Sequence, residues 1–244
     1  MKFLKFGSSN KFIVFLHGWG ADKNSFLWAK RYFEDYSLIF VDFPGFGESA
    51  EPQKPYNVYD YVCRLKEILD QFYIEELVLV GHSFGGRVAI KFSFLFQNDY
   101  ANFKLCLVDI AGLKPKRSIK YFFNVARYKF YKKHFPNSKK LDKFGSSDYK
   151  ALSKIMKQTF VLVVNEDLSN YAKYIKCKTV IIWGEKDTET PIYMAKRLKK
   201  LIKNSKLIII KNAGHFSFLD EPVEFILNLE KLIKEKGGIY LWMD

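Results

Sequence analysis

The chain has 244 residues, a formal net charge of +14 and 48% hydrophobic residues. This length and composition predict one globular domain with a sizeable apolar core, and they exclude a disordered or fibrous protein. The three cysteines, Cys63, Cys106 and Cys177, are odd in number and show no C-x-x-C spacing. We therefore expect free thiols, and neither a disulfide framework nor a zinc site.

Targeting and membrane signals are weak in this sequence. The apolar run FIVFL at residues 12–16 is too short for the core of a signal peptide, and no small-residue cleavage site follows it. No other segment is long and apolar enough to span a bilayer. We therefore expect a cytoplasmic protein without a membrane span.

Six short apolar runs, rich in β-branched and aromatic residues, predict the strands of a sheet. Their hydrophobicity is continuous rather than alternating, which is typical of parallel strands covered on both faces. The stretches between them carry helical periodicity, as in residues 58–72, and parallel strands need such crossovers. The pattern predicts an α/β fold with these strands: 12–16, 37–41, 76–80, 104–108, 179–183 and 206–210.

One connection is much longer than the others. About 70 residues separate the strand that ends near Val108 from the strand that begins near Thr179, which is too long for a bare loop in a compact domain. Its segments KYFFNVARYKFYKKHF and YKALSKIMKQTFVLVV indicate helices with aromatic stripes and lysine-rich outer faces. We predict a helical cap over residues 112–173, inserted into a core formed by residues 1–111 and 174–244.

This long connection also carries most of the positive charge. Residues 113–160 hold 14 lysines and arginines against Asp142 and Asp148, a net charge of +12. Such a concentration attracts polyanions and acidic proteins. No recognisable nucleic-acid-binding module accompanies it, so we expect no nucleic-acid partner.

The run 76–80 leads directly into the sequence GHSFGG. Gly81, Ser83 and Gly85 therefore form a G-x-S-x-G pattern between a predicted strand and the helical segment RVAIKFSFLF. This is the context of a nucleophile elbow, in which a sharp turn projects the serine hydroxyl above the sheet and leaves no room for larger neighbours. We predict Ser83 as a nucleophile.

A serine hydroxyl needs a neighbouring base to take its proton. Of four histidines, His82 lies inside the pattern, His134 lies in the basic segment, and His17 follows the first strand, where we expect it to shape a loop. His215 follows the strand 206–210, at the carboxyl edge where α/β sheets collect ligands. We predict His215 as the base.

The base must in turn be held in one tautomer by a carboxylate. Asp187 lies at a turn in WGEKDTETP, directly after the strand 179–183, with Glu185 and Glu189 on either side. Asp109, at the end of the strand 104–108, is a rival for this role. We predict Asp187 as the acid and keep Asp109 as the alternative.

The resulting order Ser, Asp, His is that of the α/β-hydrolases, and the chain resembles this family along most of its length. The resemblance implies a mostly parallel central sheet flanked by helices, with a helical cap inserted after the sixth strand. It also implies an oxyanion hole formed by the backbone N–H groups of Trp19 and Phe84, and no metal or organic cofactor. The motifs that carry it are HGWG at 17–20, DFPGFGES at 42–49, GHSFGG at 81–86, WGEKD at 183–187 and AGHF at 213–216.

A serine as the predicted nucleophile limits the classes of hydrolase to which the chain can belong. Haloalkane dehalogenases and epoxide hydrolases of this fold have an aspartate at the position of Ser83. Carboxylesterases, thioesterases, lactonases, perhydrolases and carbon–carbon bond hydrolases remain. We predict a serine hydrolase that cleaves a carboxylic ester or thioester of a small or medium apolar acyl group through an acyl-enzyme. A carbon–carbon bond hydrolase and a non-catalytic binding protein stay as alternatives.

A further alternative concerns the partner. A strongly basic cap resembles the lids of pimeloyl-acyl-carrier-protein methyl ester esterases, a group in which HGWG also occurs. This resemblance implies that an acidic carrier protein presents the acyl ester and docks on the cap. The residues predicted to receive it are Lys116, Arg117, Arg127, Lys132 and Lys133.

Overall fold

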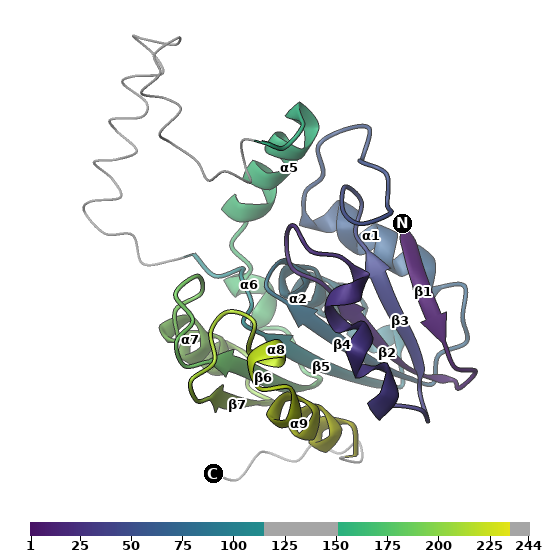
Figure 1. Cartoon of the computed structure of the whole chain (residues 1–244), viewed down its shortest axis with the longest axis vertical. Coiled ribbons are helices and arrows are strands. Elements are labelled where there is room, and N and C mark those ends of the chain that lie inside the picture. The colour runs from purple at the N-terminus through teal and green to yellow at the C-terminus, as the bar shows by residue number, and fades with distance from the viewer. Residues whose placement is uncertain (115–150, 235–244) are drawn as a thin grey trace.

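The structure is a computed structural model, and it describes residues 1–114 and 151–234 (Figure 1). The predicted carrier-binding residues of the cap, Lys116 to Lys133, lie outside the described residues, as does His134. The division into core and cap therefore stays a prediction, although the described end of the insertion contains two helices.

A seven-stranded sheet forms the centre of the described structure. Its strand order is β1-β3-β2-β4-β5-β6-β7, and all neighbours are parallel except β1 and β3. The parallel strands therefore end at one common edge. The strands are β1 (Lys2–Phe6), β2 (Lys11–Leu16), β3 (Ser37–Asp42), β4 (Glu76–His82), β5 (Asn102–Val108), β6 (Lys178–Gly184) and β7 (Ser205–Ile210).

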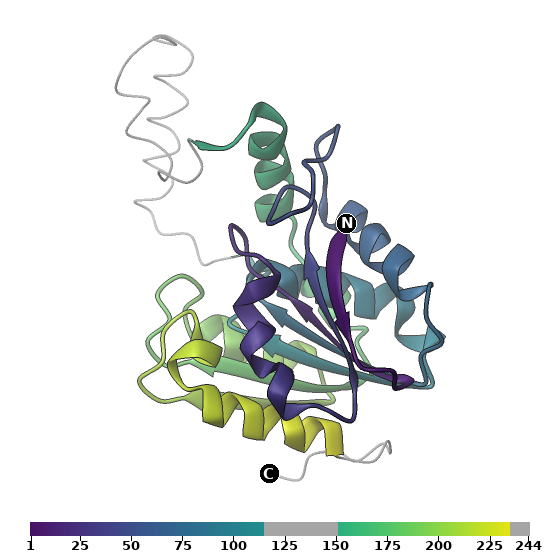
Figure 2. The same cartoon turned by 45° about the vertical axis from the view of Figure 1, so that its right-hand side comes forward.

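Helices cover both faces of this sheet (Figures 1 and 2). Alternate side chains of β2 show the two layers: Val14 and Leu16 pack with α1, α2 and α7, whereas Ile13 and Phe15 pack with η1, α8 and α9. The helices are the 3₁₀ helices η1 (Lys23–Tyr32) and η2 (Gln97–Asp99), α1 (Val58–Leu69), α2 (Phe84–Phe96), α5 (Lys154–Asn165), α6 (Ser169–Ala172), α7 (Tyr193–Leu201), α8 (Ser217–Asp220) and α9 (Pro222–Lys234).

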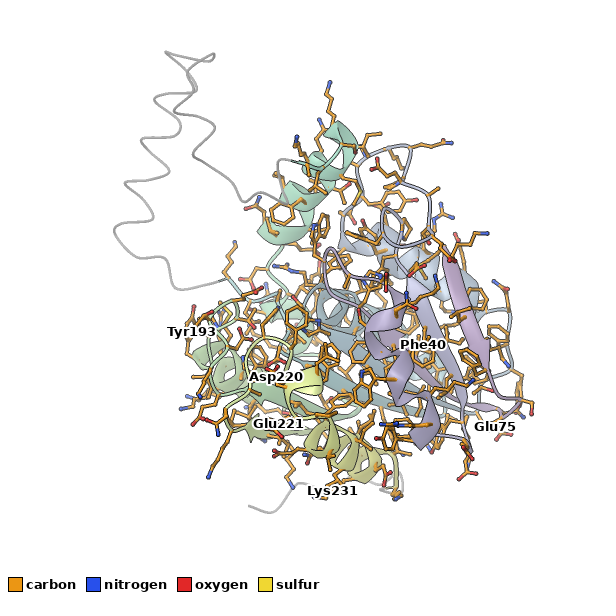
Figure 3. All side chains as sticks on the ribbon, in the orientation of Figure 1. Phe40, Glu75, Tyr193, Asp220, Glu221 and Lys231 are labelled. Atoms are coloured by element: carbon orange, nitrogen blue, oxygen red, sulfur yellow. The ribbon has the colours of Figure 1, made fainter. Side chains whose placement is uncertain are left out.

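Burial explains why the strands were visible in the sequence. All six predicted runs are strands, and β3 and β4 are buried at every position. In Figure 3 the fully buried Phe40 of β3 lies within the protein, while Glu75 and Lys231 lie at its periphery. Both faces of these strands are covered, so the predicted continuous hydrophobicity has its physical cause here.

β1 was not predicted. Its side chains are exposed or only partly buried, because it is an antiparallel edge strand, and its sequence KFLKF carries neither a continuous apolar run nor strict alternation. The position of the insertion also differs from the expectation. It follows β5, the fifth strand of the described sheet, rather than a sixth, because five of the seven described strands precede it.

The described end of the insertion lies beyond the carboxyl edge of the sheet. In Figures 1 and 2, α5 stands apart from the helices that cover the sheet. Arg87 of α2 anchors it by donating to the carbonyl oxygens of Val163 at 2.8 Å and Glu166 at 3.0 Å. A second contact joins α5 to the core: the Thr159 hydroxyl accepts the N–H of Tyr56 at 3.0 Å.

No helix within residues 1–114 and 151–234 has the length and apolar character needed to cross a bilayer. The cytoplasmic location stays a prediction.

Candidate active site

Ser83 lies at a strained turn between β4 and α2. Its φ of +48° is in a region of backbone conformation that residues other than glycine rarely adopt. Such backbone strain costs about 1–3 kcal/mol of stability. The flanking glycines are required by space: a Cβ on Gly85 would lie 2.1 Å from the carbonyl oxygen of Leu16, and one on Gly81 would lie 2.7 Å from that of Gly85. This turn therefore has the geometry expected of a nucleophile elbow.

Loops from three strand ends bring Ser83, His215 and Asp187 together. The Ser83 hydroxyl lies 3.1 Å from Nε2 of His215, and Nδ1 of His215 lies 2.9 Å from Oδ2 of Asp187. A carboxylate only accepts, so Nδ1 carries the proton and Nε2 is left to accept from Ser83. The arrangement is a continuous hydrogen-bonded chain from carboxylate to hydroxyl.

The Asp187 carboxylate is held by its own loop. Its Oδ1 accepts the N–H groups of Glu189 at 2.8 Å and Thr190 at 2.9 Å, and its Oδ2 accepts the Thr190 hydroxyl at 2.6 Å. Burial raises the pKa of Asp187, but the hydrogen bonds from His215 and Thr190 outweigh burial and lower it overall. Asp187 is therefore ionised at neutral pH.

The pKa of His215 moves in the opposite direction. Burial lowers it, but the hydrogen bond and charge of Asp187, together with the charges of Glu189 and Asp109, raise it above the ordinary value of 6.5. The neighbouring carboxylates thus stabilise the imidazolium form, which is the form that a base reaches after it accepts a proton.

The loop that carries His215 is fixed on both sides of the imidazole. Asp220, which Figure 3 labels near α8, accepts the N–H of Gly214 at 2.7 Å. Ser217 donates its N–H and its hydroxyl to Oδ2 of Asp109, at 3.1 and 2.5 Å. Both contacts limit the movement of the backbone around His215.

Asp109, the alternative acid, forms its hydrogen bonds with groups other than the His215 imidazole. Besides Ser217, it accepts the N–H of Gly184 on Oδ1 at 2.7 Å, and its hydrogen bonds in the described structure do not include His215. It is fully buried, and burial raises its pKa to about 7. Asp109 thus joins the end of β6 to the start of α8.

Two other histidines are buried near Ser83. His17 donates from Nδ1 to the carbonyl oxygen of Gly18 at 2.7 Å and accepts the N–H of Phe43 on Nε2 at 3.1 Å, so it shapes the loop after β2 as expected. Burial lowers its pKa to about 4. Nε2 of His82 lies 2.8 Å from the backbone carbonyl oxygen of His215, and the described hydrogen bonds of its ring do not include the Ser83 hydroxyl.

The two residues predicted to form an oxyanion hole both lie near Ser83: Phe84 follows it in the chain, and Trp19 lines the same pocket. Phe84 is the first residue of α2, so its N–H has no acceptor within the helix. Its ring is buried and packs against Trp19, with the ring centres 5.4 Å apart. Trp19 lies in the loop after β2 and lines the same pocket as Ser83.

A cavity of about 330 Å³ opens beside Ser83 and His215. Phe160 of α5 forms part of its wall, and its ring centre lies 5.1 Å from that of Trp19. The insertion therefore contributes directly to the pocket. The lining residues are Gly18, Trp19, Gly20, Ala21, His82, Ser83, Phe160, Glu189, His215 and Phe216.

Three contributors to the site were missed in the sequence. Thr190 follows Asp187 by three residues, and it donates its N–H and its hydroxyl to the Asp187 carboxylate. An aspartate often accepts a backbone N–H at this spacing, so the local sequence could have indicated this contact. The contact of His82 with the His215 backbone and the place of Phe160 in the pocket had no signal, because both depend on residues far apart in the chain. Within residues 1–114 and 151–234, no group of three or more acidic, histidine or cysteine side chains is arranged to hold a metal ion.

Comparisons with known proteins find relatives that match most of this chain. A model of the alpha/beta hydrolase family matches residues 13–228. A pimeloyl-[acyl-carrier protein] methyl ester esterase of Wigglesworthia glossinidia brevipalpis is 29% identical, over 94% of this chain and 96% of its own. Lipase 1 of Psychrobacter immobilis is 27% identical, over 85% of this chain and 72% of its own.

A solved structure shows the same architecture. An esterase from Exiguobacterium antarcticum superposes with a TM-score of 0.74 at 25% identity, covering 96% of this chain and 95% of that chain.

Proposed function

Because the chain belongs to the alpha/beta hydrolase family, we propose that it is a serine hydrolase that cleaves a carboxylic ester or thioester through an acyl-enzyme. The observation that carries the proposal is the chain of hydrogen bonds from Asp187 through His215 to the Ser83 hydroxyl, at 2.9 and 3.1 Å. Relatives named esterase and lipase support an ester as the substrate.

In the proposed first half-reaction, the Ser83 oxygen attacks the ester carbonyl while Nε2 of His215 takes the hydroxyl proton. The negative charge that develops on the carbonyl oxygen is stabilised by the N–H groups of Trp19 and Phe84, and each such donor contributes about 3 kcal/mol of barrier lowering. The C–O bond then breaks, and the imidazolium gives its proton to the departing alcohol.

In the second half-reaction, water attacks the acyl-enzyme. Nε2 of His215 takes a proton from the water, and the tetrahedral intermediate collapses with the return of that proton to the Ser83 oxygen. The products are an alcohol and a carboxylic acid, which ionises at neutral pH. Asp187 remains ionised throughout and stabilises each imidazolium.

The pocket favours a small or medium apolar acyl group. Its volume of about 330 Å³ is at the lower end of the usual range for ligand sites, and aromatic rings form much of its wall. The rings come from Trp19, Phe160 and Phe216.

A first experiment compares wild type with Ser83→Ala on 4-nitrophenyl esters of increasing acyl length. We expect Ser83→Ala to lose at least about a thousandfold in kcat, since it removes the nucleophile. The control is Ser8→Ala, an exposed serine far from the site in the chain, which should leave kcat unchanged. Retention of activity within tenfold in Ser83→Ala would overturn the proposal.

A second readout does not depend on the choice of substrate. A fluorophosphonate probe forms a covalent bond with an activated serine. We expect mass spectrometry to find the adduct on Ser83 in wild type, and none at this position in His215→Ala, in which the serine is no longer activated.

The natural ester is proposed, as a second and narrower candidate, to be linked to an acidic carrier protein. Two observations favour it: the +12 charge of residues 113–160, and the 29% identity to an esterase named for a carrier-linked substrate. The test is charge reversal of Lys116, Lys132 and Lys133 to glutamate. kcat/KM should fall on a carrier-linked methyl ester and stay unchanged on the free ester.

The matched control for this test reverses charges on the core instead. Lys200→Glu, Lys203→Glu and Lys231→Glu replace three exposed lysines, and so make the same change in net charge without altering the insertion. Equal losses in both sets, or no loss of carrier-linked activity in the first set, would refute docking on the basic segment. Added salt should weaken carrier-linked turnover selectively, because it screens the attraction.

A further inference from the structure

The active-site pocket contains an acidic side chain to which the proposed mechanism assigns no interaction with the substrate. Glu189 lines the cavity, and its Oε2 lies 3.4 Å from Nε2 of His215, the same nitrogen that faces the Ser83 hydroxyl. No lysine or arginine is among the described lining residues. The described lining of the pocket therefore includes a carboxylate beside the nitrogen that faces the Ser83 hydroxyl.

A hydrogen bond holds the backbone of Glu189 in place. The N–H of Glu189 donates to Oδ1 of Asp187 at 2.8 Å, so the residue belongs to the same tight turn as the proposed catalytic acid. Its side chain remains 66% exposed. Water and salt therefore reach the carboxylate and weaken its electric field.

Ester hydrolysis changes the charge of the bound group. The substrate ester is neutral at its reacting carbon, whereas the acid product carries a carboxylate at the same carbon. That carboxylate forms beside Ser83 Oγ, and Glu189 lies against the imidazole that contacts this oxygen. Two negative charges in one pocket repel each other, while the neutral ester is not repelled.

We propose that Glu189 is a specificity-determining residue: its carboxylate selects esters that carry no negative charge near the ester bond, and it promotes release of the carboxylate product. The inference rests on the proposed ester hydrolysis. Esters of monoanionic diacids with a short spacer are the substrates that it excludes, and the corresponding diesters are the substrates that it accepts.

The test compares wild type with Glu189→Gln on a pair of substrates of similar size, dimethyl succinate and monomethyl succinate. The ratio of their kcat/KM values cancels any change in the basicity of His215, because both substrates use the same base. We expect the preference of wild type for the diester to fall about three- to tenfold in Glu189→Gln, and to fall in wild type when salt is added.

Glu185→Gln is the matched control. It removes the same charge from the same loop, but Glu185 points to the N–H of Asn212 at 3.2 Å and does not line the pocket. Its preference should stay within twofold of wild type. An unchanged preference in Glu189→Gln, or an equal fall in Glu185→Gln, would overturn the inference.

Product affinity gives a readout that does not require turnover. Butyrate binding, measured by calorimetry on the Ser83→Ala background, should tighten about three- to tenfold when Glu189→Gln is added. If no serine-dependent hydrolysis of either ester occurs, the proposed function fails, and equal butyrate affinities would separately overturn the role of Glu189.

Discussion

The imidazole of His82 donates a hydrogen bond from Nε2 to the backbone carbonyl oxygen of His215, 2.8 Å away across 133 positions of sequence. Burial and the nearby His215 lower the pKa of His82 to about 3, so it stays neutral and retains this tautomer. Its ring also packs against Phe216 and Phe218. The residue before the proposed nucleophile therefore supports the loop of the proposed base.

We predict from this contact that His82→Ala lowers kcat by about ten- to a hundredfold, because small misplacements of reacting groups cost this much. His82→Gln can still donate a hydrogen bond from its amide, and it should recover part of the loss. The comparison is made by ester kinetics and by the rate of fluorophosphonate labelling of Ser83. Full activity in His82→Ala, with an unchanged melting temperature, would contradict a positioning role.

The two buried aspartates near His215 should differ in their effect on catalysis. Asp187→Asn removes the acceptor of the Nδ1 proton and permits the wrong tautomer, so we expect kcat to fall by roughly 10⁴-fold. Asp109→Asn alters the contacts to Gly184 and Ser217 and removes one of the smaller contributions that raise the pKa of His215, and we expect a fall of about tenfold or less. A larger loss in Asp109→Asn than in Asp187→Asn would assign the acid to Asp109.

The pH dependence should follow the proton on His215. The protonated imidazole cannot accept the Ser83 proton, so kcat/KM rises with pH as His215 loses its proton. The neighbouring carboxylates hold its pKa above 6.5 against the effect of burial, and the midpoint of this rise should therefore lie above about 6.5.

This midpoint can be checked directly by an NMR titration of the His215 ring in Ser83→Ala. Adding Asp187→Asn removes the main group that raises the pKa, so the midpoint should move to lower pH. A rate that is flat down to about pH 4 would exclude a histidine base.

The sequence made the parallel strands and the three members of the proposed triad visible for physical reasons. β2 to β7 bury both faces or much of them and so contain continuous apolar runs. Ser83 and His215 follow strand ends at a common edge, which makes their proximity predictable from topology alone.

Other contacts left no such signal. The bond from His82 ends on a backbone carbonyl, which every residue has, so no residue type at position 215 reveals it. The choice between Asp187 and Asp109 depends on side-chain direction, since both follow strand ends near His215. Glu189 was visible only as a neighbour of Asp187, because its approach to Nε2 of His215 depends on the fold of the turn.

Replacing Gly85, the glycine after Phe84 in the elbow, should lower the stability of the fold. A Cβ there would lie 2.1 Å from the carbonyl oxygen of Leu16 and 2.8 Å from that of His17, and backbone atoms cannot move aside cheaply. We predict that Gly85→Ala lowers the free energy of unfolding by about 1–3 kcal/mol or more, as overpacked cores do. Gly214→Ala is the matched control, since its Cβ would meet only Asp220 at an ordinary 3.6 Å. Urea unfolding of both variants decides the matter: equal stabilities would mean that the strand–helix contact at the elbow is looser than these distances require.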